Sequence, residues 1–461
     1  MKRNPWVTGA PIATLTSRSV PRLPISIALV ATCPPRQCGI ATFASDLAGS
    51  IVASDAAATV SWAAIDQPWR AHRYGPDVRW RIEQGDPASY RAAAEDLNRS
   101  HVDLVAIQHE FGLFGVWSDG FVDHLEPFLD VIRKPLVTTL HTVLPEPHPS
   151  HRRALQLIGE RSAAVVVMTE TAKRLLANEY GVRESRIHVI AHGVPPMPAF
   201  GRDRAKAKLG LDGRTVIATF GLVDPRKGLE YAIGAMKAVA EEYPEALYLI
   251  LGRTHPEFVR TSGESYRDQL TTLVDFLGLS GNVRFIDRYL VQDDIVDYLR
   301  ATDVYVTPYL DPNQITSGTL AYALGAGRAI VSTPYLHAAE ALAEGRGILV
   351  DFRSERALAE CVVRVLGDAG LRSELERKAF EYGRHTFWPT VARRTLNLYR
   401  EVPGQQSIAI DRGPGASSGI NQRQQRPRSE RNADGGPTAA GVAVLDRTGR
   451  PPRDPKPELP G

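Results

Sequence analysis

The stretch VIATFGLVDPRKG, residues 216–228, decides the fold. Residues 216–220 are an apolar, β-branched run of strand length, and the glycine-containing loop 221–228 follows it. After this loop, apolar residues recur at the spacing of a helix that buries one face: Leu229, Ile233, Met236 and Ala240. A buried strand, a loop and an amphipathic helix in succession are the building unit of a parallel α/β sheet.

Runs of the same kind recur in two series, separated by helical patterns. The first series comprises residues 25–31, 60–65, 102–107, 136–140, 163–168 and 187–190. The second comprises residues 216–220, 247–251, 283–286, 304–306, 329–331 and 348–350. Two series predict an α/β protein with two Rossmann-like domains that face each other across a cleft.

Proline and polar segments set the predicted boundaries. The sequence HGVPPMP at 192–198 is unsuited to a helix, so we place the interdomain linker there. This gives an N-terminal domain over residues 23–196 and a C-terminal domain over residues 197–380. Residues 1–22 and 402–461 are rich in Pro, Ser, Gly and Arg, and we expect them to be disordered.

Composition excludes several classes of protein. The 461 residues carry a net charge of only +3, which gives no case for a nucleic-acid partner. The three cysteines, Cys33, Cys38 and Cys361, do not form a disulfide framework or a zinc motif. No apolar run reaches the roughly 18 residues of a membrane span, so we expect a cytoplasmic protein. Arginines such as Arg393 and Arg394 leave peripheral contact with the inner face of a membrane open, although a solvated charged face is the favoured interpretation.

Candidate binding residues in the first domain follow the ends of its predicted strands. Gly39 lies at a loop-to-helix junction, where free N–H groups favour a phosphate, although it could simply serve a turn. His109 and Glu110 precede a loop rich in glycine and aromatic residues that suits a substrate-binding lip. His141 follows the next strand, where it could donate a hydrogen bond to a sugar hydroxyl or a leaving oxygen. For His109, a purely structural role in the core is an equally good interpretation.

Two junctions in the second domain favour an anion. Arg226 and Lys227 stand after Gly221 at a helix start, where adjacent cations are unfavourable unless a negative charge joins them. The second junction, before residues 320–324, offers free N–H groups and comprises Thr316, Ser317, Gly318 and Thr319. A solvated pair and a plain helix cap are the alternatives. If the strands lie side by side, both junctions open on one crevice and could hold a diphosphate.

Seven short motifs together resemble the retaining family 4 glycosyltransferases of the GT-B fold, in particular their mannosyltransferase-like branch. They are CGIAT at 38–42, QHEFG at 108–112, TLHT at 139–142, HGV at 192–194, PRKG at 225–228, GRTHP at 252–256 and NQITSG at 313–318. The resemblance covers roughly residues 24–400. It implies transfer of a hexosyl group, mannose being favoured, from a nucleoside-diphosphate sugar to a glycan, lipid-linked or small glycoside acceptor. It also implies a last helix, residues 381–401, that crosses back to the first domain.

The resemblance assigns roles to individual residues. Gly39 resembles the glycine that approaches the donor phosphate, His141 the histidine beside the reacting carbon, and Lys227 the lysine that neutralises the diphosphate. Leu222 stands where relatives have an arginine, for which Arg226 is the substitute. Residues near the donor or acceptor sugar would include His109, Glu110 and His192.

The family's two glutamates fall at Gln314 and Tyr322, so neither carboxylate is present. Their absence points to altered specificity or lost activity. We expect a front-face mechanism that needs no metal and no cofactor, in which the protein stabilises charge developing on the leaving diphosphate.

Two other functions stay open on the same architecture. A hydrolysing sugar-nucleotide epimerase would need acid and base carboxylates in the cleft, for which Glu110 and Glu340 are the candidates. A catalytically silent nucleotide-sugar binding protein would account for the missing glutamates. A phosphorylase would need a lysine that carries pyridoxal phosphate, and no motif supports one.

Overall fold

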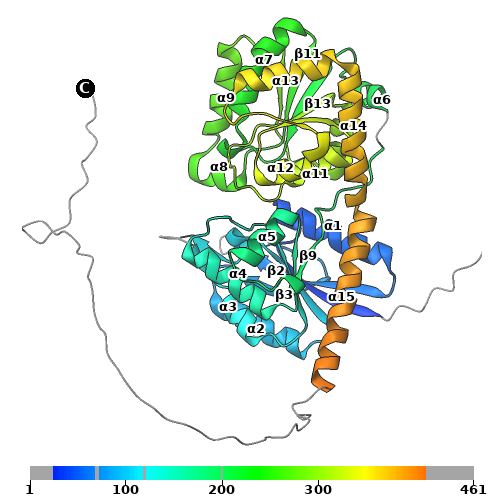
Figure 1. The fold of residues 1–461 in the computed structure, drawn as a ribbon. Helices are drawn as coiled ribbons and strands as arrows, with labels where there is room; N and C mark the ends of the chain where they lie inside the picture. Colours follow the sequence, from blue (N-terminus) through cyan, green and yellow to red (C-terminus); the bar gives the residue numbers. More distant parts are fainter. Residues whose placement is uncertain (1–23, 68–71, 118–120, 199–200, 412–461) are drawn as a thin grey trace, which may run out of the picture. The chain divides into compact units, whose positions relative to one another are not determined.

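The computed structural model describes residues 24–67, 72–117, 121–198 and 201–411, which contain two parallel sheets in succession (Figure 1). The predicted pair of Rossmann-like domains is confirmed. The expected disorder of residues 1–22 and of most of the tail falls outside the described residues.

The N-terminal sheet is parallel, in the order β3-β2-β1-β4-β7-β8-β9. Its strands are β1 (Ile25–Ala31), β2 (Ala58–Asp66), β3 (Val78–Glu83), β4 (Leu104–His109), β7 (Leu136–Leu140), β8 (Ala164–Val167) and β9 (Ile187–Val189). The helices of this part are α1 (Gly39–Ser54), α2 (Pro87–Arg99), α3 (Glu126–Val131), α4 (Pro149–Arg161) and α5 (Glu170–Asn178). A small antiparallel hairpin, β5 (Gly115–Trp117) and β6 (Phe121–Asp123), follows β4.

The C-terminal sheet is also parallel, in the order β12-β11-β10-β13-β14-β15. Its strands are β10 (Thr215–Phe220), β11 (Ala246–Leu251), β12 (Val283–Ile286), β13 (Val304–Thr307), β14 (Ala329–Ser332) and β15 (Ile348–Leu349). The helices are α6 (Arg202–Leu209), α7 (Leu229–Glu242), α8 (Pro256–Ser262), α9 (Ser265–Phe276), α10 (Gln292–Ala301), α11 (Gly318–Gly325), α12 (Leu336–Ala341), α13 (Glu355–Gly367), α14 (Ala369–Gly383) and α15 (Trp388–Asp411).

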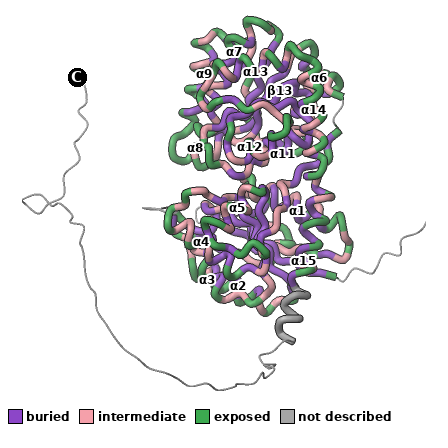
Figure 2. Tube along the Cα trace, in the orientation of Figure 1, coloured by how far each residue is buried: buried purple, intermediate pink, exposed green. Residues whose placement is uncertain are grey.

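Each sheet is buried on both faces, as expected for parallel strands covered by helices. Along β1, Ile27 and Leu29 pack into one core cluster, whereas Ala28 and Val30 pack into another. The alternation follows from the two-residue period of a strand. Figure 2 shows the result, with the strands buried and the exposed residues gathered on the outer helices and loops.

Two segments cross between the sheets side by side. Val194 of the predicted linker accepts a hydrogen bond from the Trp388 amide (2.8 Å) and donates one to the Thr386 carbonyl (3.0 Å). Beyond this crossing, α15 packs against α1, and Trp388, Ala392 and Leu396 join the core of the N-terminal sheet (Figure 1).

The last helix differs from its predicted bounds. It begins at Trp388 and not at residue 381, and it continues beyond 401 to Asp411. Residue 381 belongs to α14, which ends at Gly383, where a Cβ would lie 2.4 Å from the Leu324 backbone. Pro389 in the first turn of α15 suits a new helix start, because its missing N–H has no acceptor there.

Candidate active site

A cavity of about 710 Å³ lies where the carboxyl ends of both sheets meet. Most of the predicted site residues line it: Gly39, Glu110, His141, His192, Gly221, Arg226, Lys227, Gln314, Thr316, Gly318 and Thr319. His109 and Ser317 do not. Ligands in open α/β folds bind outside the carboxyl ends of the strands, so this position fits a substrate site.

Lys227 brings a cation to the C-terminal side of the cavity. It ends the short 3-10 turn Pro225–Lys227, which Asp224 caps, and its Nζ lies 3.8 Å from the centre of the Tyr309 ring. Burial lowers the pKa of Lys227 to about 8, although the nearby Asp224 carboxylate opposes the shift. An anionic ligand beside Nζ would restore the charged form.

Gly228 makes this turn possible. Its φ is +60°, a left-handed conformation that most residues avoid, and a Cβ would lie 2.2 Å from the Pro308 carbonyl oxygen. α7 begins directly after it. The position of Lys227 therefore depends on a glycine that no larger residue can replace without moving the backbone.

Arg226 lines the cavity but is already paired. Its Nε and Nη2 donate to the two carboxylate oxygens of Asp224, each at 3.0 Å, while its side chain remains largely exposed. Arg226 can add positive potential near a diphosphate. Its Nη1 takes no part in these two bonds, so Arg226 can act as the substitute for the arginine absent at Leu222 while it stays paired with Asp224.

The N-terminus of α11 forms the second predicted junction. Ser317 is the N-cap, and its amide donates to Nδ1 of His337 at 2.8 Å. The expectation that this N–H contacts phosphate needs correction, because the amide is already used. Gly318 and Thr319 occupy the first turn, where amides have no acceptor within the helix. A Cβ on Gly318 would lie 2.8 Å from Nε2 of His192, so this close approach requires glycine.

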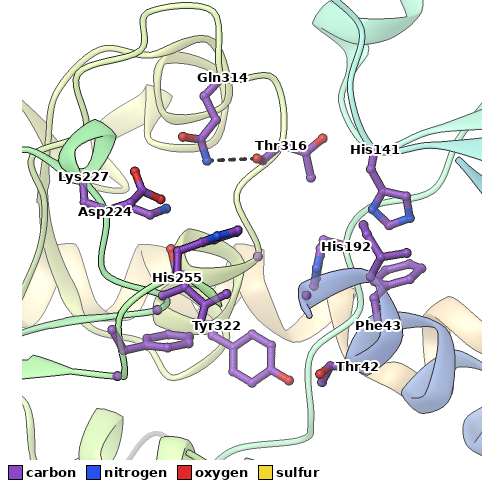
Figure 3. A pocket seen from close by; sticks show the side chains of 18 of the residues that line it. Thr42, Phe43, His141, His192, Asp224, Lys227, His255, Gln314, Thr316 and Tyr322 are labelled. Atoms are coloured by element: carbon purple, nitrogen blue, oxygen red, sulfur yellow. Dashed lines mark hydrogen bonds between the residues drawn. The ribbon is translucent and has the colours of Figure 1, made fainter. Parts of the chain in front are cut away.

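His141 differs in one respect from the expected hydrogen-bond donor. Its Nε2 lies 3.0 Å from Oε1 of Gln108, which can only accept, so Nε2 carries the proton. Burial lowers the pKa of His141 to about 3, and the ring is neutral. Nδ1 is therefore a hydrogen-bond acceptor. Phe43 packs edge-on against the ring, and Figure 3 shows the pair with His192 beside them.

His109 and Glu110 separate, although they are adjacent in sequence. His109 is fully buried, stacks on Phe114 and does not reach the cavity, because successive residues of a strand face opposite sides. Burial lowers its pKa to about 3. Glu110 lines the cavity and accepts hydrogen bonds from the Phe111 amide (3.0 Å) and the Thr142 hydroxyl (2.7 Å), while burial raises its pKa.

Residues at the positions of the family's glutamates also line the cavity. Gln314 donates from Nε2 to the Thr316 carbonyl oxygen at 3.1 Å (Figure 3). Tyr322 packs edge-on against Phe220, with ring centroids 5.7 Å apart. Glu340 is not a lining residue, because its carboxylate accepts the amides of Glu170 and Thr171, both at 2.8 Å. The epimerase hypothesis thus loses one of its two carboxylates.

Sequence reasoning missed other residues of the cavity wall. Asp46 lies on the same face of α1 as Gly39, Thr42 and Phe43, and the i, i+3, i+4, i+7 spacing could have identified it. His255 falls within the GRTHP motif, although no role was predicted for it, and no comparable sequence signal identifies Tyr289. The same holds for His337, which lies outside the cavity wall and binds the Ser317 amide.

Two features are absent from the described residues. In these ranges, no group of three or more His, Cys, Asp or Glu side chains could hold a metal ion. The helices of the same ranges include none that is both long and apolar enough to cross a membrane.

Similarity to known proteins agrees with this geometry. Residues 39–197 match the model of "Glycosyltransferase Family 4", and residues 214–368 match "Glycosyl transferases group 1". Among solved structures, Anabaena Alr3699/HepE in complex with UDP has a TM-score of 0.63 at 16% identity and covers 82% of this chain and 100% of that one. Sucrose-phosphate synthase from Thermosynechococcus elongatus has a TM-score of 0.64 at 18% identity, with 84% and 100% covered.

Three curated relatives are 25% to 27% identical to this chain. D-inositol 3-phosphate glycosyltransferase of Corynebacterium glutamicum is 25% identical over 310 residues, which span 63% of this chain and 72% of that protein. The corresponding protein of Rhodococcus jostii is 27% identical over 283 residues, and the match spans 58% of this chain and 61% of that one. Mannosylfructose-phosphate synthase of Agrobacterium fabrum is 26% identical over 253 residues, covering 53% and 54%.

The two domains and the cavity between their strand ends define a glycosyltransferase of the GT-B fold. Within that class, the N-terminal domain matches the family 4 model and the C-terminal domain matches the group 1 model.

Proposed function

We propose that the protein transfers a hexosyl group, mannose being favoured, from a nucleoside-diphosphate sugar to a glycan, lipid-linked or small glycoside acceptor. The observation that carries the proposal is that Lys227 and the N-terminus of α11 line one cavity from separate loops. Positive charge and free amides converging on a confined space suit a diphosphate. Relatives named for inositol phosphate and mannosylfructose phosphate support a hexosyl transfer that involves a phosphorylated sugar or polyol.

The proposed mechanism is retaining, front-face and free of metal or cofactor. Lys227 and the amides of Gly318 and Thr319 would stabilise negative charge on the departing diphosphate. The diphosphate itself would take the acceptor's proton, so no separate base is needed. His141, with an unprotonated Nδ1, would accept a hydrogen bond from a sugar hydroxyl and would not protonate a leaving group. Gly39 would let the substrate approach the first turn of α1.

The test is a donor screen with a matched lysine control. GDP-mannose, UDP-glucose, UDP-galactose, UDP-N-acetylglucosamine and ADP-glucose are incubated with the protein and EDTA, and nucleotide release is followed by chromatography. Lys227→Ala should lose turnover about 100-fold or more, since it removes charge stabilisation in the transition state. Lys237→Ala, at an exposed position of α7, should behave as the wild type. Binding of a donor without turnover would favour the silent binding protein, and lack of binding with every donor would reject the transferase.

A further inference from the structure

Four carboxylates line the cavity, and three of them have hydrogen-bond partners. Glu110 is held by the Phe111 amide and the Thr142 hydroxyl, and Asp224 by the Arg226 guanidinium. Asp311 accepts a hydrogen bond from the Asn313 amide at 2.9 Å. The fourth carboxylate, Asp46, differs from the others.

Asp46 keeps a buried oxygen without a partner. Among the residues that the structure describes, none lies at hydrogen-bond geometry from its Oδ2. Burial raises the pKa of Asp46 to about 6, and the nearby Trp388 indole, its potential hydrogen-bond donor, opposes this shift without reaching the geometry of a hydrogen bond. Trp388 Nε1 is itself without a partner of good geometry. Buried polar groups left unpaired are costly, so they occur mainly where a ligand or a special role accounts for them.

The surroundings of Asp46 are polar and come from both domains. Thr42, one turn earlier on α1, is 2.8 Å from the Tyr289 hydroxyl of the C-terminal domain. Tyr322 of α11 is close enough that the Asp46 charge adds to the effect of burial in raising the pKa of its phenol. Figure 3 shows the Tyr322 hydroxyl directed toward Thr42.

The position of Asp46 matters because two expected carboxylates are absent from the second domain. The chain has Gln314 and Tyr322 where the family's carboxylates would fall, and both residues line the same cavity as Asp46. A carboxylate accepts hydrogen bonds more strongly than an amide, and a sugar or ribose ring presents several hydroxyl donors. Asp46 comes from α1 of the opposite domain, and its charge reaches the Tyr322 phenol.

We propose that the Asp46 carboxylate accepts a hydrogen bond from a hydroxyl group of the bound substrate, replacing from the N-terminal domain the acceptor that positions 314 and 322 lack. The inference rests on the proposed function, which supplies a substrate rich in hydroxyl groups. It makes Asp46 a substrate-binding residue that the N-terminal domain contributes to the site.

The experiment compares Asp46→Asn with the wild type in binding and turnover. Calorimetry first identifies which of UDP, GDP and ADP binds the wild-type protein. Affinities are then measured for that nucleotide, for its 2′,3′-dideoxy analogue and for the matching nucleotide sugar. Loss of a charged acceptor should weaken binding of the hydroxyl-bearing ligand about tenfold. Asp46→Glu, which keeps the carboxylate, should recover part of this loss.

The pattern of loss identifies the hydroxyl. If Asp46→Asn binds the ribonucleotide more weakly but its dideoxy analogue normally, the partner is the ribose. If only the nucleotide sugar is affected, the partner is the donor sugar. If binding is unchanged and the KM for the acceptor rises about tenfold, the partner is the acceptor. Each of these results supports the proposal.

A matched control separates this role from folding. Asp96→Asn, at an exposed site on α2, should leave every affinity unchanged. Wild-type affinities and kinetics in a folded Asp46→Asn protein would overturn the proposal while leaving the transferase intact. If no nucleotide binds the wild type, the proposed function fails first, and the inference fails with it.

Discussion

At the scale of single residues, burial disfavours the charged forms of the cavity's histidines and of Lys227. It lowers the pKa of His141 to about 3, of His192 to about 4 and of Lys227 to about 8. The histidines are therefore uncharged near neutral pH, and Lys227 is the cation whose charge is most sensitive to what occupies the cavity. A buried cation without its anion lowers the free energy of unfolding, so the empty site destabilises the folded protein.

Because of this cost, we expect that replacing Lys227 with methionine raises the free energy of unfolding, and that the increase depends on pH. The folded-state pKa is depressed from 10.5, so the unfolded chain binds the proton more tightly. The penalty is fully present below about pH 8 and disappears as pH rises toward 10.5. Lys227→Met should therefore stabilise the empty protein at pH 7, by up to about 3 kcal/mol, with the difference shrinking by pH 10.

Urea unfolding at pH 7 and pH 10 measures this effect. Lys237→Met, at an exposed site, should change the free energy of unfolding by less than about 0.5 kcal/mol at either pH. A Lys227→Met protein that is less stable than the wild type at both pH values would show that contact with the Tyr309 ring outweighs the cost of burying the charge.

At the scale of elements, His337 holds the loop segment 314–317 to the start of α12. Its backbone amide donates to the Gln314 carbonyl oxygen at 3.1 Å, and its Nδ1 accepts the Ser317 amide at 2.8 Å. Burial lowers the pKa of His337 to about 4, which keeps Nδ1 available as an acceptor at neutral pH. The two bonds fix the segment that presents Gly318 to the cavity.

His337→Leu should loosen this loop, whereas His337→Asn should largely preserve it. Leucine leaves the buried Ser317 amide without an acceptor, which costs about 1–3 kcal/mol. The Asn oxygen can take the place of Nδ1. We expect nucleoside-diphosphate affinity, measured by calorimetry, to fall about tenfold in the leucine variant and about twofold or less in the asparagine variant. Equal losses in both would mean that His337 acts through its volume alone.

Elements could be predicted from sequence where one local pattern dominates. The central strands β1, β7 and β10 are continuous apolar runs, and their predicted bounds agree with the structure to within one residue. β3, with the sequence VRWRIE, was missed because this edge strand alternates charged, partly exposed residues with apolar ones. The hairpin β5–β6 was also missed, because each strand has only three residues.

The candidate site was predictable only in part, for a similar reason. His141 directly follows β7, and Gly39 and Lys227 end the loops that follow β1 and β10, so local sequence places all three at the edge of a sheet. Whether a side chain at such an edge reaches the cavity depends on packing, as the burial of His109 shows. The orientation of the His141 ring depends on Gln108 of a neighbouring strand, and the use of the Ser317 amide depends on His337, twenty residues away in sequence.

At the scale of the whole molecule, contacts between the two domains border the cavity. Thr42 meets Tyr289, Gln37 accepts from Arg253 at 3.0 Å, and Glu340 binds the first amides of α5. The Glu340 contact places a carboxylate at a helix N-terminus, where the helix dipole favours negative charge. A carboxylate of the C-terminal domain thus caps a helix of the N-terminal one.

The Glu340 contact predicts that one substitution in the C-terminal domain changes protection in the N-terminal domain. In Glu340→Ala, the amides of Glu170 and Thr171 lose their acceptors, so hydrogen exchange at the start of α5 should speed up about tenfold or more, as expected for loss of roughly 1.5–3 kcal/mol from bonds to a charged group. Mass spectrometry of the peptide around residues 168–176 reads this out. Glu344→Ala removes an exposed carboxylate that pairs with Arg346 and should leave the peptide unchanged. If exchange is identical in both variants, the domains separate often enough in solution that the cap contributes nothing, and substrate binding should then restore the difference.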